Sequence, residues 1–98
     1  MKNTVKNKAI IEKLFTEGKR FTTKNLMLRM IDGIDAYMVT VSSKVFKRAV
    51  DRNRIKRLMR EVIRGTSVKG TFVLIYIGKE MPNLDVLKSE FDEIRKRL

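Results

Sequence analysis

Cationic side chains are concentrated between Lys44 and Arg64. This stretch holds nine Lys or Arg residues, at positions 44, 47, 48, 52, 54, 56, 57, 60 and 64, and two acids, Asp51 and Glu61, so its net charge is +7 (nine minus two). The whole chain of 98 residues carries +12. A charge excess of this size repels itself unless a polyanion neutralises it, and the planar guanidinium fork of Arg fits phosphate oxygens. These residue types therefore predict a phosphate-binding surface.

The residues that most catalytic and metal-binding sites use are absent or scattered in this sequence. The chain has no His and no Cys, which argues against zinc sites, thiol nucleophiles and imidazole bases. No carboxylate cluster is evident, and Asp32 and Asp35 are interpreted as turn residues beside Gly33. A metal would be a hard cation held by carboxylates or, more readily, by the phosphates of a bound nucleic acid. Among polyanions, nucleic acid is the most frequent partner of a basic domain this small.

The elements that must position these cations follow from hydrophobic periodicity. The pattern predicts an α+β fold in one domain over residues 1–98, with a sheet of three or four strands covered by helices. The run from Thr71 to Ile77 is nearly all apolar and predicts a central strand covered on both faces. Asp32-Gly33 favours a tight hairpin turn between the strands that flank it. The expected elements are a helix over Lys6–Glu17, a weak strand over Lys19–Thr22, strands over Asn25–Ile31 and Tyr37–Val41, a helix over Lys44–Arg64, a strand over Thr71–Ile77 and a helix over Asn83–Leu98.

The helix expected over Lys44–Arg64 has two unlike sides. At about 100° per residue, its apolar residues fall on one side, which must face the sheet: Ile55, Leu58, Met59, Val62 and Ile63. The other side carries Asn53, Lys56, Arg57, Arg60 and Arg64, with Arg52 at the border. The alternative is an ordinary solvated face. Such faces usually interleave both signs, whereas like charges four residues apart, such as Arg52 and Lys56, destabilise a free helix. The layout therefore predicts a cationic side that is available to phosphates.

The order of residues from Ser43 to Glu61 resembles the signature of the bacterial ribonuclease P protein subunit. Its centre is Arg52-Asn53-Arg54, which is followed by Lys56-Arg57 and Arg60 and preceded by Ser43-Lys44 and Ala49-Val50. The resemblance extends over almost the whole chain. It implies an αβββαβα sandwich, ribosomal protein S5 domain 2-like, in which a small mixed sheet is packed by helices. It also implies that the basic helix lies in a left-handed βαβ crossover.

The same resemblance implies a function. The partners would be the catalytic RNA of ribonuclease P and precursor tRNA, and the reaction would be hydrolytic, endonucleolytic removal of the 5′ leader in the cytoplasm. The RNA would supply the active site and hold most of the Mg²⁺, with no catalytic side chain from the protein. The residues expected to contact RNA are Ser43, Lys44, Arg48, Arg52, Asn53, Arg54, Lys56, Arg57, Arg60 and Arg64. A cleft between helix and sheet would contact the single-stranded leader through Phe15, Phe21, Arg29 and Tyr37.

The chain departs from the family pattern at several positions. Ile11 stands where Phe is frequent, Val45 replaces a second Lys, Lys47 replaces a Gly, and Arg29 stands near a usual strand aromatic. These changes bear on the leader contacts rather than on the RNA-binding helix.

Two other functions compete with this interpretation. A structural nucleic-acid-binding module such as a ribosomal protein would have the same composition. An amphipathic helix that binds a membrane surface or a calmodulin-like partner would have the same two-sided pattern, but its apolar side has no Trp and is needed by the sheet. The longest apolar run, Phe72–Ile77, is too short to span a bilayer, and Ala9–Ile11 is too short for a signal peptide. No membrane partner and no small-molecule substrate are therefore expected.

Overall fold

The computed structural model describes residues 3–4, 8–66 and 68–98. Its helices and strands follow the αβββαβα order that is expected, with one short additional strand at the start. The elements are β1 (Asn3–Thr4), α1 (Lys8–Glu17), β2 (Lys19–Thr22), β3 (Leu26–Ile31), β4 (Ala36–Val41), α2 (Ala49–Arg64), β5 (Thr71–Tyr76) and α3 (Leu84–Arg95). Lys6 and Asn7, where the first helix was expected to begin, lie outside the described residues.

The five strands form one mixed sheet in the order β1-β4-β5-β3-β2. β5 is antiparallel to β3 and parallel to β4, so the prediction of a central strand is confirmed. The predicted hairpin between the strands on either side of Asp32-Gly33 is wrong, because β5 lies between β3 and β4. Asp35, in the connection between β3 and β4, instead binds the start of β5: its Oδ1 accepts a hydrogen bond from the backbone N–H of Gly70 at 2.8 Å. The side chains of β5 are buried on both faces of the sheet, and the centre of the sheet is where both faces are covered.

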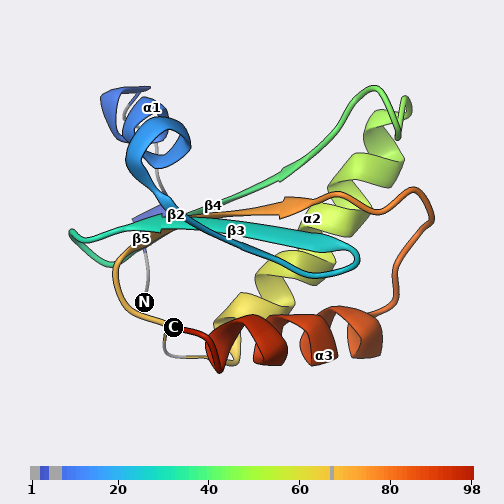
Figure 1. The fold of residues 1–98 in the computed structure, drawn as a ribbon. Coiled ribbons are helices and arrows are strands. Elements are labelled where there is room, and N and C mark those ends of the chain that lie inside the picture. The colour runs from blue at the N-terminus through green and yellow to red at the C-terminus, as the bar shows by residue number, and fades with distance from the viewer. Residues whose placement is uncertain (1–2, 5–7, 67) are drawn as a thin grey trace.

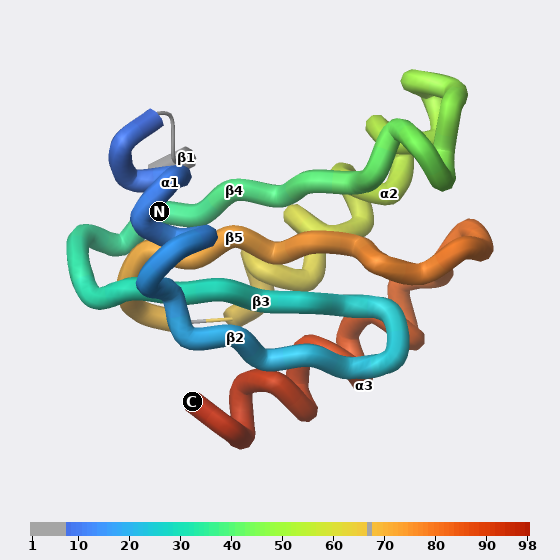
Figure 2. Tube along the Cα trace, turned by 45° about the horizontal axis from the view of Figure 1, so that its top comes forward, coloured from blue at the N-terminus to red at the C-terminus, as the bar shows by residue number. Residues whose placement is uncertain are grey.

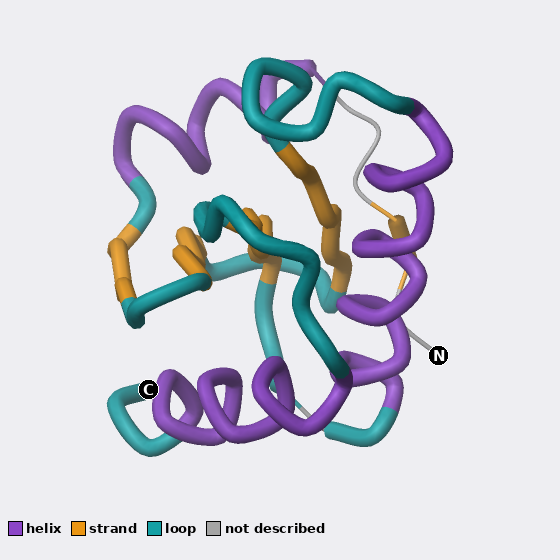
Figure 3. Tube along the Cα trace, turned by 90° about the vertical axis from the view of Figure 1, so that its right-hand side faces the viewer, coloured by secondary structure: helices purple, strands orange, loops and turns teal. Residues whose placement is uncertain are grey.

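The helices cover the two faces of the sheet unequally. α2 and α3 lie together on one face, and α1 lies over one end of the other face (Figure 1). Figure 3 shows α1 and α3 on opposite sides of the strands. Figure 2 looks onto the α1 face: β4 and β5 both run from left to right, β5 lies below β4, and α2 passes behind the sheet. The β4–α2–β5 crossover is therefore left-handed, against the usual rule.

The main core lies between the sheet and the α2/α3 layer. Residues paired directly across neighbouring strands share a face, and the pairs Leu28–Leu74 and Val39–Leu74 place these side chains on the covered face. From the helices, Ile55 and Phe91 are fully buried in the same cluster. In the described part of the chain, no helix is long and apolar enough to cross a membrane.

The basic helix begins later than its sequence suggests. The prediction of a helix from Lys44 is wrong for the first five residues, because α2 begins at Ala49. Residues 43–45 form a turn, in which the Phe46 N–H donates to the Ser42 carbonyl at 3.0 Å. Phe46 is only 8% exposed and packs its ring 5.9 Å from that of Tyr76. The chain places the Phe46 ring in the core first and only then turns back along the sheet as α2. A straight helix that began at Lys44 would not allow this order. α2 ends at Gly65 as predicted.

Candidate nucleic-acid interface

The predicted two sides of α2 are present in the structure. Ile55 and Met59 are fully buried against the sheet, and Val62 and Ile63 are nearly so. Leu58 is half-buried and packs against the same core. Five buried or half-buried residues at helical spacing therefore attach one side of α2 to the sheet.

The opposite side of α2 is cationic and largely unpaired. Asn53, Arg54, Arg57, Arg60 and Arg64 are exposed, and Lys56 is half-buried. Of these cations, Arg64 has an acidic neighbour, Glu61, at 3.6 Å. Within the described residues, none of the other four lies within 4.0 Å of a carboxylate. Their charges are therefore available to an external polyanion.

The loop between β4 and α2 adds cations beside the start of the helix. Ser43, Lys44, Lys47 and Arg48 are all exposed there. Arg52, at the border of the two sides of α2, is half-buried and donates through Nη1 to the Phe46 and Lys47 carbonyls, each at 2.8 Å. The expected RNA-binding residues thus come from a loop and a helix rather than from one continuous helix.

The four residues expected in a leader cleft do not share one surface. Phe21 is paired with Leu28, and Tyr37 is paired with Phe72, on the covered face of the sheet. Both pack against the main core, and the Tyr37 ring stacks on Phe72 with centroids 6.0 Å apart. The period-two alternation of their strands turns Phe21 and Tyr37 toward α2 and α3, on the opposite face of the sheet from Arg29.

Phe15 and Arg29 do come together, on the face of the sheet that α1 covers only in part. The guanidinium carbon of Arg29 lies 5.7 Å from the centroid of the Phe15 ring, and its Nη1 donates to the Phe15 carbonyl at 2.8 Å. The buried Nε of Arg29 has no hydrogen-bond partner. Arg20 pairs directly with Arg29 across β2 and β3, an arrangement of like charges that is unfavourable without an anion. Sequence reasoning missed Arg20 because its strand was only weakly indicated.

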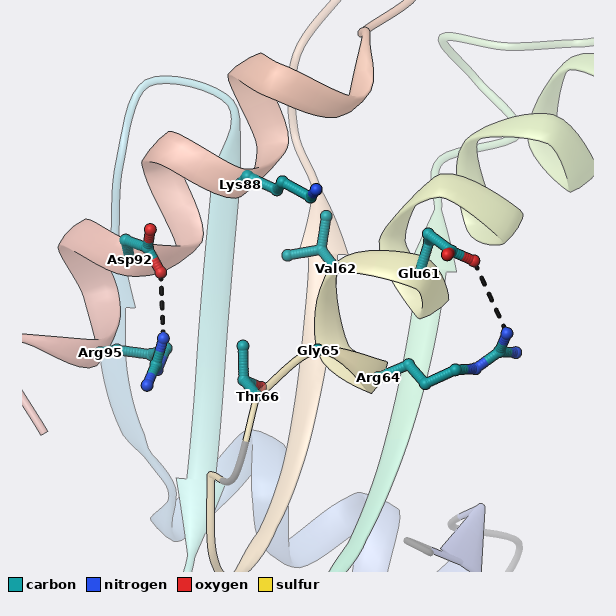
Figure 4. Close-up of a pocket in the computed structure, with 8 residues that line it drawn as sticks. All are labelled: Glu61, Val62, Arg64, Gly65, Thr66, Lys88, Asp92 and Arg95. Carbon is teal, nitrogen blue, oxygen red and sulfur yellow. Dashed lines mark hydrogen bonds and ion pairs between the residues drawn. The ribbon is translucent and has the colours of Figure 1, made fainter.

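A pocket of about 450 Å³ lies between the end of α2 and α3, at the Arg64 end of the cationic side of α2 (Figure 4). Its lining mixes charges of both signs. Both of its acids are already paired, Glu61 with Arg64 at 3.6 Å and Asp92 with Arg95 at 3.0 Å. The pocket therefore has a smaller excess of positive charge than the cationic side of α2, with three cations and two acids in its lining.

Glu90, on α3, joins that helix to the turn before β3. Its carboxylate accepts hydrogen bonds from the Thr23 hydroxyl at 2.5 Å and from the backbone and side-chain nitrogens of Asn25, each at 2.7 Å. Burial alone would raise the pKa of Glu90, but these hydrogen bonds and the nearby Lys24 hold the pKa below its ordinary value. The contact is structural: it fixes α3 against the sheet and lies outside the cationic surface.

The described residues offer no ready site for a metal ion. No three His, Cys, Asp or Glu side chains come together among them. Mg²⁺ prefers several oxygen ligands and usually takes part of them from phosphates and water. The residues that the structure describes therefore do not fit a magnesium site made by protein side chains alone.

Comparisons with known proteins agree with this geometry. A family model described as Ribonuclease P matches residues 1–98. The "Ribonuclease P protein component" of Borrelia garinii subsp. bavariensis is 33% identical over 84 residues, which cover 74% of this chain and 76% of that protein. The protein of the same name from Synechocystis sp. is 41% identical over 54 residues, which cover 51% of this chain but only 44% of that protein.

The fold has solved counterparts as well. The structure of the RNase P protein from Thermotoga maritima superposes with a TM-score of 0.82 at 23% identity, covering 99% of this chain and 98% of that one. At this identity the likeness concerns the fold, and the family match over the full chain carries the assignment. With its Arg-Asn-Arg motif on a two-sided helix in a left-handed crossover, the chain belongs to the ribonuclease P protein family.

Proposed function

We propose that this chain is the protein subunit of ribonuclease P and binds the catalytic RNA through the cationic side of α2 and the loop before it. The observation that carries the proposal is the set of four cations on α2 that have no acidic partner among the described residues, Arg54, Lys56, Arg57 and Arg60. Neutralising phosphates with such groups releases counterions, and this supplies most of the affinity for a polyanion.

We also propose that the 5′ leader of precursor tRNA lies on the partly open face of the sheet beside α1. The support is the contact of Phe15 with Arg29 and the adjacent Arg20. Single-stranded RNA binds by stacking its bases on aromatic rings or guanidinium planes while cations follow its backbone. Phe15 is 42% exposed, so a base has access to this ring.

In this proposal the protein positions two RNAs and performs no chemistry itself. It has no His or Cys in its sequence, and the described residues do not fit a magnesium site of their own. The RNA subunit would hold Mg²⁺ and cut the leader, in the cytoplasm where precursor tRNA is made. The protein would lower the Mg²⁺ concentration that cleavage requires, because its cations share in neutralising the phosphates.

Reconstitution tests the proposal directly. The protein is added to ribonuclease P RNA from the same organism, and cleavage of precursor tRNA is followed across Mg²⁺ concentrations. We expect no cleavage by the protein alone and a large increase in cleavage by the RNA at low Mg²⁺. A protein that fails to raise cleavage, or that binds mature and precursor tRNA complexes equally well, would instead fit a general structural RNA-binding module.

A further inference from the structure

Arg52 differs from the other cations of α2 in what its guanidinium contacts. Its Nη1 donates to two successive backbone carbonyls, those of Phe46 and Lys47, at 2.8 Å each. Hydrogen bonds from a charged donor are stronger than neutral ones. Because both bonds come from one nitrogen of a planar group, they orient the two peptide groups together. Arg52 therefore connects the first turns of α2 to the loop that precedes the helix.

Within this loop, residues 42–48, the side chain of Phe46 is anchored in the core, and two hydrogen bonds to Ser42 restrain the first half of the backbone. The Lys44 N–H donates to the Ser42 hydroxyl at 3.2 Å, and the Phe46 N–H donates to the Ser42 carbonyl at 3.0 Å. Arg48 stands at the N-cap of α2 in an extended conformation and makes no side-chain capping bond. Figure 3 shows the loop as the segment that joins β4 to α2 at the top of the view. In the second half of the loop, the burial of Phe46 anchors the side chain, and the Arg52 bonds hold the backbone carbonyls of residues 46 and 47.

The loop presents its charges outward. Lys44, Lys47 and Arg48 are exposed, while Phe46 between them is buried in the core. If the Phe46 and Lys47 carbonyls lost Arg52, they would turn to water, and the loop cations would no longer be held in one arrangement. Binding would then have to order them, which costs conformational entropy and weakens affinity.

We propose that Arg52 is a positioning residue, which orders the Ser42–Arg48 loop so that Lys44, Lys47 and Arg48 extend the cationic side of α2 as a preformed RNA-binding surface. The inference rests on the proposed function, since it concerns how the same surface meets RNA. It assigns Arg52 a role different from that of Arg57 or Arg60, which are exposed and have no partner of opposite charge among the residues that the structure describes.

The first test uses the protein without RNA. Amide hydrogen exchange at Phe46 is compared in the wild type, Arg52→Ala and Arg57→Ala, because this N–H is bonded within the loop and its protection reports local opening. We expect protection to fall at least tenfold in Arg52→Ala and to stay unchanged in Arg57→Ala, with both variants still folded by circular dichroism. Equal protection in all three proteins would overturn the positioning role.

The second test is a double-mutant cycle for binding of ribonuclease P RNA. Lys44→Ala is combined with Arg52→Ala and, as a matched control, with Arg57→Ala. We expect Lys44→Ala to weaken binding several-fold in the wild type and in Arg57→Ala. In the Arg52→Ala background, Lys44→Ala should change RNA affinity by about twofold or less, because the loop is already disordered there. The log–log salt slope should also fall by more in Arg52→Ala than the about 0.9 expected for one lost phosphate contact.

The outcomes separate the two proposals. Two results together would overturn the positioning role and leave the proposed function intact. The effects of Lys44→Ala and Arg52→Ala on RNA affinity would be additive, and the log–log salt slope of Arg52→Ala would change by only the about 0.9 of one phosphate contact. A wild-type protein that binds this RNA without salt dependence would overturn the proposed function and the RNA-binding part of the inference, while the exchange experiment would still decide whether Arg52 orders the loop.

Discussion

Met59 and Arg60 are neighbours in sequence, and their replacement by Ala is expected to have opposite consequences. Met59 is 0% exposed and lies in the main core, whereas Arg60 is exposed and has no carboxylate within 4.0 Å among the described residues. Truncating a fully buried Met to Ala costs about 2–5 kcal/mol. For a domain of this size each kcal/mol lowers the melting temperature by about 4–8 °C, so Met59→Ala should melt about 10 °C or more below the wild type.

Arg60→Ala should leave the free energy of unfolding within about 0.5 kcal/mol of the wild type, because its side chain is exposed and has no ion pair among the described residues. Its effect should appear in RNA binding instead. Each phosphate contact contributes about 0.9 to the slope of log affinity against log salt, so the slope for Arg60→Ala should be smaller by about one unit. Met59→Ala, measured well below its melting temperature, should keep the wild-type slope.

Two measurements decide the matter. Urea or thermal unfolding gives the stability of each variant, and fluorescence anisotropy with labelled ribonuclease P RNA, repeated from about 50 to 200 mM salt, gives the slope. If Arg60→Ala destabilised the fold as much as Met59→Ala and left the slope unchanged, the assignment of the two sides of α2 would be refuted.

Three further predictions concern the stability of the fold. Glu90→Gln should lower stability at neutral pH by about 1–3 kcal/mol, because hydrogen bonds from residues 23–25 lose their charged acceptor. Since the folded-state pKa of Glu90 is lowered, its contribution is present above the ordinary Glu pKa of about 4.3 and lost as pH falls through the folded pKa; urea titrations at several pH values should show a weaker acid dependence for the variant. Gly18→Ala should destabilise by about 1–3 kcal/mol in the same assay, because a Cβ there would overlap the Leu14 carbonyl, whereas a variant as stable as the wild type would mean that the chain relaxes locally. Asn83→Ala should cost about 1 kcal/mol by thermal melting, since the Asn83 side chain caps α3, and an unchanged melting temperature would show that water replaces the cap.

The hydrophobic period was enough to predict the elements around the site. Apolar residues at helical spacing identified the side of α2 that faces the sheet, and all five of them are buried or half-buried. The near-continuous apolar run of β5 identified the central strand. These features depend on the side chains of one segment and on the geometry of that segment alone, so they can be predicted without knowledge of the rest of the chain.

The strand faces could not be predicted in the same way. Alternation shows that Phe21 and Tyr37 each lie on one face of a strand, but it does not say which face the helices cover. That choice is made by α2 and α3, which pack on the face that carries Leu28 and Leu74. Phe21 and Tyr37 follow these residues into the core, and the opposite face keeps Arg29.

The sequence by itself determined that this protein has a cationic helix with one side committed to a core, and the order of residues from Ser43 to Glu61 indicated the family. Tertiary structure alone decided that β5 inserts between β3 and β4, that α2 begins at Ala49 and that Arg52 holds the loop before it. The physical reason is the range of the interactions. Helical periodicity is set by neighbours three or four residues apart, whereas strand order and the burial of Phe46 are set by contacts between distant segments, whose energies depend on the whole packed fold.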